Sequence, residues 1–180
     1  MPDLRDITFN KTDGSVGTLA EYADEVVLVV NVASKCGLTP QYEALQALYA
    51  AKRAEGFTIL AFPANNFADQ EPGTDADIAE FCSTNYSVTF PILSKINVVG
   101  DDQHPLYAAL TEQMPTAEGN EGFRERLRSH GLSPTEDPDV LWNFEKFLIG
   151  RGGQVVARFG PAVTPDAPTL VAAIQVELAK

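Results

Sequence analysis

The stretch EVVLVVNVASKCGLTP, residues 25–40, places a nearly unbroken run of valine and leucine directly before a polar turn that ends in proline. An apolar run without alternation is typical of a β-strand that is covered on both faces. Thr39 suits the N-cap of a following helix, and Pro40 suits its first position. The sequence therefore predicts a strand over residues 25–33 that leads into a helix, with Cys36 at the junction.

A second apolar strand follows the predicted helix. Four large side chains of that helix share one face: Tyr42, Leu45, Leu48 and Tyr49. Gly56 supplies a helix stop, and residues 57–62 form another apolar run. Strand, helix and strand together predict one right-handed βαβ unit whose two strands are parallel.

The rest of the chain alternates turn signals with short periodic segments. We expect an N-terminal β-hairpin over residues 5–20, helices over 75–85, 105–111 and 167–178, and strands near 90–99, 143–149 and 154–159. Residues 112–140 are polar and loop-like, with a helix around 123–128. The sequence as a whole predicts an α/β, thioredoxin-like fold, in which helices flank both faces of a central mixed β-sheet.

Composition and charge restrict the class of protein. The 180 residues fit one domain over residues 1–180, and 13 basic against 25 acidic residues give a net charge of −12. Such a charge opposes binding to nucleic acid and to anionic membranes. The first residues lack a secretory signal, and no apolar run approaches the roughly 18 residues of a membrane span. Because the cysteines are few, Cys36 and Cys82, we expect a cytoplasmic location.

Three segments are expected to meet at one edge of the sheet. In open α/β sheets, functional groups gather beyond the carboxyl ends of the parallel strands. Cys36 follows the first such strand, and Gln70 lies in the loop after the second. If the strand over 143–149 is antiparallel, Trp142 and Asn143 begin at the same edge. A helix start favours a thiolate, and amide and indole donors stabilise a thiolate or a departing oxyanion.

Each of these residues also has a purely structural interpretation. A lone cysteine after a strand is often a small buried hydrophobe, a single tryptophan usually fills the core, and a loop glutamine is usually solvated. On its spacing alone, Cys82 is an inert thiol on the apolar face of its helix. Arg124, Arg126 and Arg128 are interpreted as a solvated helical face, with guidance of an acidic partner as the alternative.

The segments around these positions resemble three signatures of the glutathione peroxidase family. They read NVASKCGLTPQY at 31–42, FPANNFADQEPG at 62–73 and WNFEKF at 142–147, and the likeness covers essentially the whole chain. The resemblance implies that the catalytic residues are Cys36, Gln70, Trp142 and Asn143. It also implies reduction of hydrogen peroxide and organic hydroperoxides through a sulfenic acid at Cys36, with no cofactor and no metal.

The chain is similar to the cysteine, thioredoxin-dependent, bacterial-type branch of that family. In this branch a second cysteine, on the helix after the active loop, resolves the sulfenic acid, and Cys82 stands in its place. The resemblance implies a thioredoxin-like reductant, or glutathione with lower efficiency. Consistent with this, no Arg or Lys lies between residues 37 and 51 to hold a glutathione carboxylate. We expect a monomer or a small homo-oligomer.

Two features depart from the family pattern. Ala64-Asn65-Asn66 stands where Cys-Asn-Gln is usual, which leaves Cys82 as the remaining intramolecular partner for Cys36. Residues 112–140 resemble the loop that builds subunit contacts in the tetrameric, glutathione-using branch, so the oligomeric state is open.

Three rival functions remain. A peroxide sensor that relays its oxidation to a client protein would share every residue and differ in its electron acceptor. A non-catalytic binding module would have an unreactive Cys36. A thioredoxin-fold copper carrier needs a Cys-x-x-x-Cys pair with a histidine. Pro40 occupies the second cysteine's place, and His104 and His130 are isolated, so the copper carrier is disfavoured.

Overall fold

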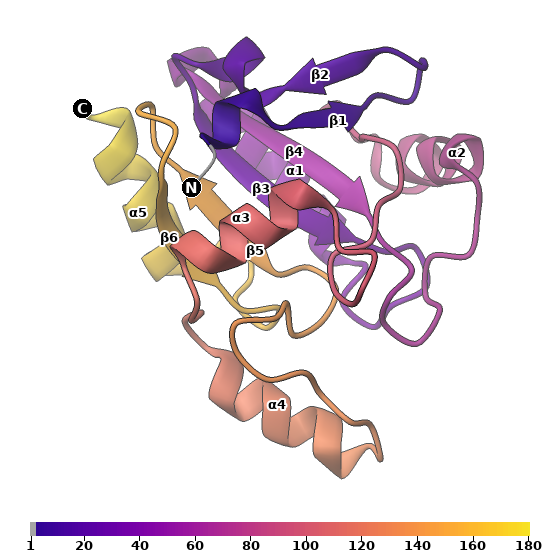
Figure 1. Cartoon of the computed structure of the whole chain (residues 1–180). Coiled ribbons are helices and arrows are strands. Elements are labelled where there is room, and N and C mark those ends of the chain that lie inside the picture. Colours follow the sequence, from indigo (N-terminus) through magenta and orange to yellow (C-terminus); the bar gives the residue numbers. More distant parts are fainter. Residues whose placement is uncertain (1–2) are drawn as a thin grey trace.

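The computed structural model describes residues 3–180 as a four-stranded mixed sheet with helices on both faces and a separate two-stranded N-terminal hairpin (Figure 1). The strands are β1 (Thr8–Asn10), β2 (Val16–Thr18), β3 (Val26–Val32), β4 (Phe57–Pro63), β5 (Lys146–Ile149) and β6 (Val155–Phe159). The helices are α1 (Gln41–Lys52), α2 (Asp75–Tyr86), α3 (Pro105–Gln113), α4 (Asn120–Ser129) and α5 (Pro168–Leu178). Short 3₁₀ helices cover Leu4–Asp6, Leu19–Tyr22 and Arg53–Glu55.

The strand order of the sheet is β4-β3-β5-β6. β3 and β4 pair in parallel along their whole length, from Val26 opposite Phe57 to Val32 opposite Pro63. Together with α1 they form the predicted βαβ unit. β5 pairs antiparallel with β3, and β6 antiparallel with β5. The residues just before β5 therefore lie at the same edge as the carboxyl ends of β3 and β4.

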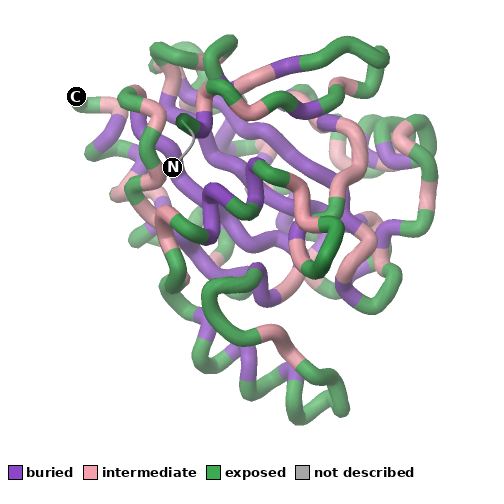
Figure 2. The backbone as a smooth tube through the Cα atoms, in the orientation of Figure 1, coloured by how far each residue is buried: buried purple, intermediate pink, exposed green. Residues whose placement is uncertain are grey.

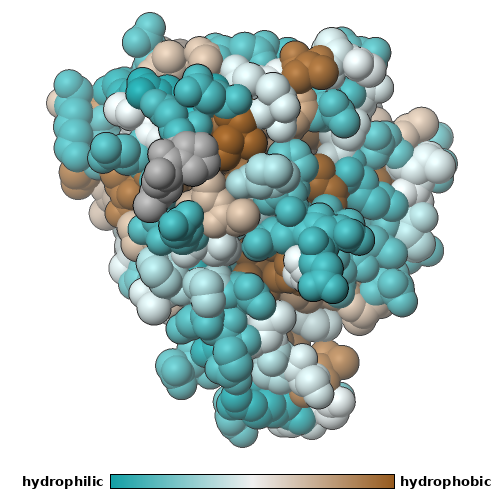
Figure 3. All heavy atoms as spheres, in the orientation of Figure 1, coloured by the Kyte–Doolittle hydropathy of each residue, from teal (hydrophilic) through white to brown (hydrophobic). Residues whose placement is uncertain are grey.

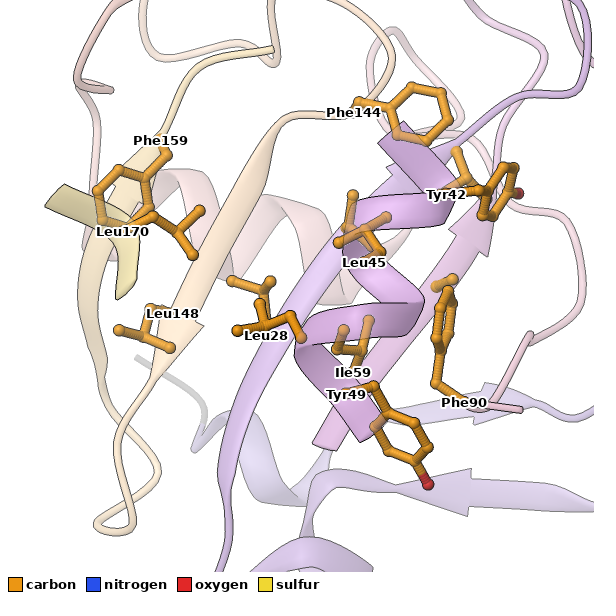
Figure 4. Packing of buried hydrophobic residues seen from close by; sticks show 14 of the residues in the cluster. Leu28, Tyr42, Leu45, Tyr49, Ile59, Phe90, Phe144, Leu148, Phe159 and Leu170 are labelled. Carbon is orange, nitrogen blue, oxygen red and sulfur yellow. The ribbon is translucent and has the colours of Figure 1, made fainter. Parts of the chain in front are cut away.

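β3 is buried at every position because both faces of the sheet are covered. Its side chains alternate between two layers, as the pleat of a strand requires. Leu28 and Val30 pack into the layer that contains α1 and α5, which Figure 4 shows from close by. Val27 and Val29 pack into the layer that contains α3 and the N-terminal hairpin. The predicted thioredoxin-like arrangement is confirmed.

Two predicted strands differ from the structure. The segment near 90–99 contributes only isolated bridges, from Ile92 to Ala61 and from Leu93 to Lys11. A proline at position 91 lacks the N–H that a regular ladder needs at that point. The strand expected from 143 begins at Lys146. Phe144 has a left-handed backbone, with φ of 69°, which interrupts the extended conformation.

A fully buried ion pair joins the residue just before β5 to a residue of β6. Arg158 Nη2 lies 2.6 Å and Nε 3.0 Å from Glu145 Oε2, and both side chains have no exposed surface. The other guanidinium N–H groups donate to the backbone oxygens of Met114, Pro138 and Asp139. These carbonyls belong to both ends of the segment that carries α4. One arginine therefore fixes that segment to the sheet.

The beginning of α4 is fixed by the same carboxylate. Asn120 Nδ2 donates to Glu145 Oε1 at 3.1 Å. The Asn120 amide lies so close to Gly160 that a Cβ there would clash with it. Beyond this anchor α4 projects from the body of the molecule, and buried and exposed residues alternate along it (Figure 2). The helix predicted around 123–128 is confirmed.

The predicted solvated face of α4 is wrong for one of its three arginines. Arg124 is only 5% exposed. Its guanidinium donates to Asp137 Oδ1 at 3.1 Å and to the Thr135 carbonyl at 3.2 Å, which closes the loop after α4. Arg126 and Arg128 are exposed, as expected.

Lys146 is a buried base in the middle of the molecule. It has no exposed surface, and its ammonium group donates to the carbonyls of Pro161 and Val163 at 3.2 and 2.6 Å. Burial lowers the pKa of Lys146 to about 7, although the neighbouring Glu145 opposes this shift.

None of the helices among residues 3–180 is long and apolar enough to cross a membrane. The prediction that the first residues lack a secretory signal includes Met1 and Pro2. These two residues lie outside the part of the chain that the structure describes.

Arg158→Met is expected to lower the free energy of unfolding by about 3–5 kcal/mol, because it leaves the Glu145 carboxylate buried without its partner. Denaturant unfolding measures the loss. Arg128→Met is the matched control, since that exposed pair contributes about 0–1 kcal/mol. Equal losses in the two variants would show that the buried pair does not anchor the fold.

Lys146→Met tests the lowered pKa of the buried amine through the pH dependence of stability. The pKa lies near 7 in the native protein and at the ordinary lysine value of 10.5 in the unfolded chain, so between these pH values the unfolded chain binds more protons. The free energy of unfolding of wild type, relative to the variant, should therefore rise from pH 7 to pH 9, by at most about 1.36 kcal/mol per pH unit. Lys180→Met, at an exposed lysine, is the control. Parallel pH profiles for wild type and Lys146→Met would contradict the shift.

Candidate functional site

Cys36 lies in a tight turn between β3 and α1. The Thr39 hydroxyl accepts from the Cys36 N–H at 3.0 Å and donates to the Ala33 carbonyl at 2.8 Å. Because this hydroxyl holds the turn closed, it does not cap the helix, and the predicted N-cap at Thr39 is wrong. Pro40 takes the N-cap position and α1 begins at Gln41.

The sulfur of Cys36 is more enclosed than a thiol at a helix start was expected to be. The residue is 9% exposed. The Leu38 backbone N–H donates to Cys36 Sγ at 3.3 Å. Sequence reasoning missed Leu38, because a backbone donor leaves no signal in the residue type.

A hollow of about 190 Å³ gives access to this thiol. Its walls include Leu38 and Trp142, together with Phe123 and Leu127 of α4. A larger hollow of about 510 Å³ lies between α1 and the start of α5, and no cysteine lines it. The small hollow is therefore the one that concerns the chemistry of Cys36.

Gln70 is held beside the turn that carries Cys36. Its backbone carbonyl accepts from the Lys35 N–H at 3.0 Å. The two residues before it, Ala68 and Asp69, both have left-handed backbones, with φ of 55° and 52°. Such conformations are costly for residues with a Cβ and concentrate at functional sites.

Asn143 reaches Gln70 across the edge of the sheet. Asn143 Nδ2 donates to Gln70 Oε1 at 2.9 Å. The bend that presents Asn143 is fixed from β3: the Phe144 N–H donates to the Asn31 carbonyl at 2.6 Å, and Asn31 Nδ2 donates to the Trp142 carbonyl at 3.0 Å. Loop and strand thus hold each other in place.

Trp142 lies half-buried between the two core layers, with its ring 5.2 Å from that of Phe67. The structure therefore brings Cys36 and Trp142 to one hollow and joins Gln70 to Asn143. Within residues 3–180, the side chains of Gln70, Trp142 and Asn143 form no hydrogen bond with the Cys36 sulfur. The one donor to this sulfur is the Leu38 N–H. The described part of the chain also holds no cluster of three or more His, Cys, Asp or Glu that could bind a metal.

Cys82 lies on the buried side of α2, as predicted, and is 1% exposed. Cys36 and Cys82 are both free thiols. Burial raises the pKa of the Cys82 thiol, and the neighbouring Tyr42 hydroxyl partly offsets this shift. Ile78 and Cys82 are the two buried residues of α2, while Phe81 and Tyr86 pack against the same core and remain partly exposed.

Glu71 is a buried carboxyl between the two cysteine-bearing segments that sequence reasoning missed. It is 1% exposed, and its Oε2 atom has no hydrogen-bond partner among the described residues. Burial raises the pKa of Glu71, and the neighbouring Ser34 partly offsets the shift. Nothing in a Gln-Glu-Pro sequence distinguishes such a carboxyl from a solvated one.

Comparison with known proteins identifies the family of the chain. The family model described as "Glutathione peroxidase" matches residues 4–111. "Thioredoxin/glutathione peroxidase BtuE" of Escherichia coli is 51% identical over 170 residues, 93% of each chain. "Hydroperoxy fatty acid reductase gpx1" of Synechocystis is 44% identical over 157 residues, 87% of this chain and 86% of that protein.

A solved structure, the apo form of Trgpx, has a TM-score of 0.73 and 34% identity, and covers 100% of this chain and 98% of its own. These likenesses extend over the whole fold rather than over one motif. The chain belongs to the glutathione peroxidase family, and it is a peroxidase.

Proposed function

We propose that the protein reduces hydroperoxides with Cys36 as the nucleophile. The thiolate attacks the terminal oxygen of the O–O bond, which breaks. Cys36 becomes a sulfenic acid, and the departing oxygen takes a proton and leaves as water or an alcohol. The observation that carries the proposal is the Cys36 sulfur, which accepts the Leu38 N–H at 3.3 Å and borders a hollow at the carboxyl end of β3.

We assign Gln70, Trp142 and Asn143 to the binding of the reacting oxygens. The Gln70–Asn143 hydrogen bond of 2.9 Å orients two amides at this edge, and Trp142 lines the hollow beside the sulfur. Donors that do not contact the sulfur at rest still serve if they lie around the peroxide, where negative charge develops as the bond breaks.

Cys82 is proposed as the resolving residue. Its thiol condenses with the sulfenic acid, which forms a Cys36–Cys82 disulfide and releases water. In the reduced structure Cys82 lies on the face of α2 that packs against the core. Because two of the twelve residues of α2 are buried, we expect this helix to unfold locally before the core strands do, which frees Cys82 to reach its partner.

A thioredoxin-like dithiol is proposed as the reductant of this disulfide. Thiol–disulfide exchange returns both cysteines to the reduced form and oxidises the donor. Two observations support a thioredoxin-like donor: the name of the E. coli relative, which gives thioredoxin beside glutathione, and the absence of Arg or Lys between residues 37 and 51.

One equivalent of hydrogen peroxide is expected to convert wild type into a species with an internal Cys36–Cys82 disulfide. Cys82→Ser should instead accumulate a sulfenic acid at Cys36, because its resolving thiol is gone. Peptide mass spectrometry after trapping of sulfenic acid distinguishes the two products. Cys36→Ser is the control and should keep Cys82 as a free thiol.

An unmodified Cys36 in Cys82→Ser would overturn the peroxidase chemistry. Steady turnover with thioredoxin, thioredoxin reductase and NADPH separates the enzyme from a peroxide sensor. A sensor would form the same disulfide but would consume NADPH slowly unless its client protein were present.

Hydrogen exchange tests the unfolding of α2. Residues 75–86 should exchange faster in the disulfide form than in the reduced protein, because Cys82 has left its buried position. α5, over residues 168–178, should exchange equally in both forms and serves as the internal control. Unchanged protection of α2 after oxidation would show that the disulfide forms without unfolding.

A further inference from the structure

The outer wall of the Cys36 hollow is built by α4 and the loop that follows it. Phe123 and Leu127 supply apolar surface from the helix, and Leu132 adds an exposed apolar side chain from the loop. Figure 3 shows apolar atoms at the surface beside the projecting end of the molecule, where α4 lies. A hollow with such walls favours an apolar chain next to the thiol.

Arg126 also lines this hollow, and its guanidinium differs from those of the other arginines of α4. The other two arginines of α4 are paired: Arg124 with Asp137, and Arg128 with Glu125 and Glu136. Within residues 3–180, Arg126 has no carboxylate within ion-pair distance. Its guanidinium carbon lies 5.5 Å from the centre of the Phe123 ring, which holds it against the apolar wall.

The size of the hollow restricts its ligand. About 190 Å³ is below the roughly 300–1,000 Å³ of pockets that enclose a whole small molecule. The space therefore suits a narrow alkyl chain better than a branched peptide. Arg126 is a cation in this lining, on a protein whose net charge is −12, and therefore favours an anionic group at this place.

We propose that the α4 wall is a recognition site for the chain of a carboxylated organic hydroperoxide, with Arg126 as the residue that binds the carboxylate. The hydroperoxide group lies at Cys36, the alkyl chain lies against Phe123, Leu127 and Leu132, and the acid end meets the guanidinium. This inference rests on the proposed peroxidase function and adds a specificity-determining residue to it.

The anchoring of α4 suits it for this role. Glu145 binds Asn120 at the start of the helix, and Arg158 binds the carbonyls on both sides of the segment. The same Glu145 stands two residues after Asn143. One buried ion pair thus sets the distance between the reacting edge and the wall that binds the chain.

The test compares linoleic acid hydroperoxide with its methyl ester, which has the same chain but no charge. Trp142 is the chain's single tryptophan and lines the hollow, so its fluorescence reports oxidation of the reduced protein in stopped flow. Wild type should react faster with the acid than with the ester. Arg126→Gln should remove this preference, by up to about fivefold, as for an exposed ion pair. Arg126→Glu should invert it.

Two control variants separate the effect of the charge from the effect of the alkyl chain. Arg128→Gln should keep the wild-type preference, because that arginine is already paired. Leu132→Asn should slow acid and ester by the same factor, because both carry the same alkyl chain. The preference for the acid should shrink when salt rises from about 0.01 M to about 1 M, because the Debye length falls from about 30 Å to about 3 Å.

The outcomes distinguish the two proposals. If hydrogen peroxide fails to oxidise Cys36, the peroxidase function itself is wrong. If hydrogen peroxide oxidises Cys36 but the acid-to-ester ratio is the same in wild type and Arg126→Glu, only the α4 site is wrong. A slower reduction by glutathione in Arg126→Glu, with that ratio unchanged, would assign the cation to the reductant and would also overturn the proposal.

Discussion

The buried pair of Glu145 and Arg158 is the constraint on which the arrangement of the site depends. An unpaired charge in this position would be strongly unfavourable, so each residue requires the other. Because both also bind backbone and amide groups of the α4 segment, the fold of a long polar insertion is set from within the sheet. The segment that borders the Cys36 hollow is therefore hydrogen-bonded to the sheet on both sides of α4.

The site combines strain with rigid support. Left-handed residues precede Gln70 and follow Asn143, and each bend is held by hydrogen bonds from a strand or from the Cys36 turn. The cost of these conformations is offset by the parallel pairing of β3 with β4 and by the burial on both faces of the sheet. By contrast, two of the twelve residues of α2 are buried. A rigid site beside a weakly held helix suits a reaction in which one cysteine stays and the other moves.

The thiol chemistry is set by the backbone as much as by side chains. The turn that Thr39 closes aims the Leu38 N–H at Cys36 Sγ, whereas Lys35, the adjacent charge, is exposed. The environment of Cys82 is different, because burial raises the pKa of its thiol. This thiol is therefore poorly ionised while α2 is folded. The two cysteines thus have different environments in the reduced protein, as the proposed division between attack and resolution requires.

The amino-acid sequence by itself determined the βαβ unit, the hairpin, the faces of α1 and α2, and the edge at which Cys36, Gln70, Trp142 and Asn143 gather. These follow from local periodicity and from the direction of parallel strands. Only the tertiary structure decided that Arg124 is buried, that Leu38 is the donor to the sulfur and that Glu145 and Arg158 hold α4. Such contacts join residues distant in sequence, or use backbone groups common to every residue, so residue types alone do not reveal them.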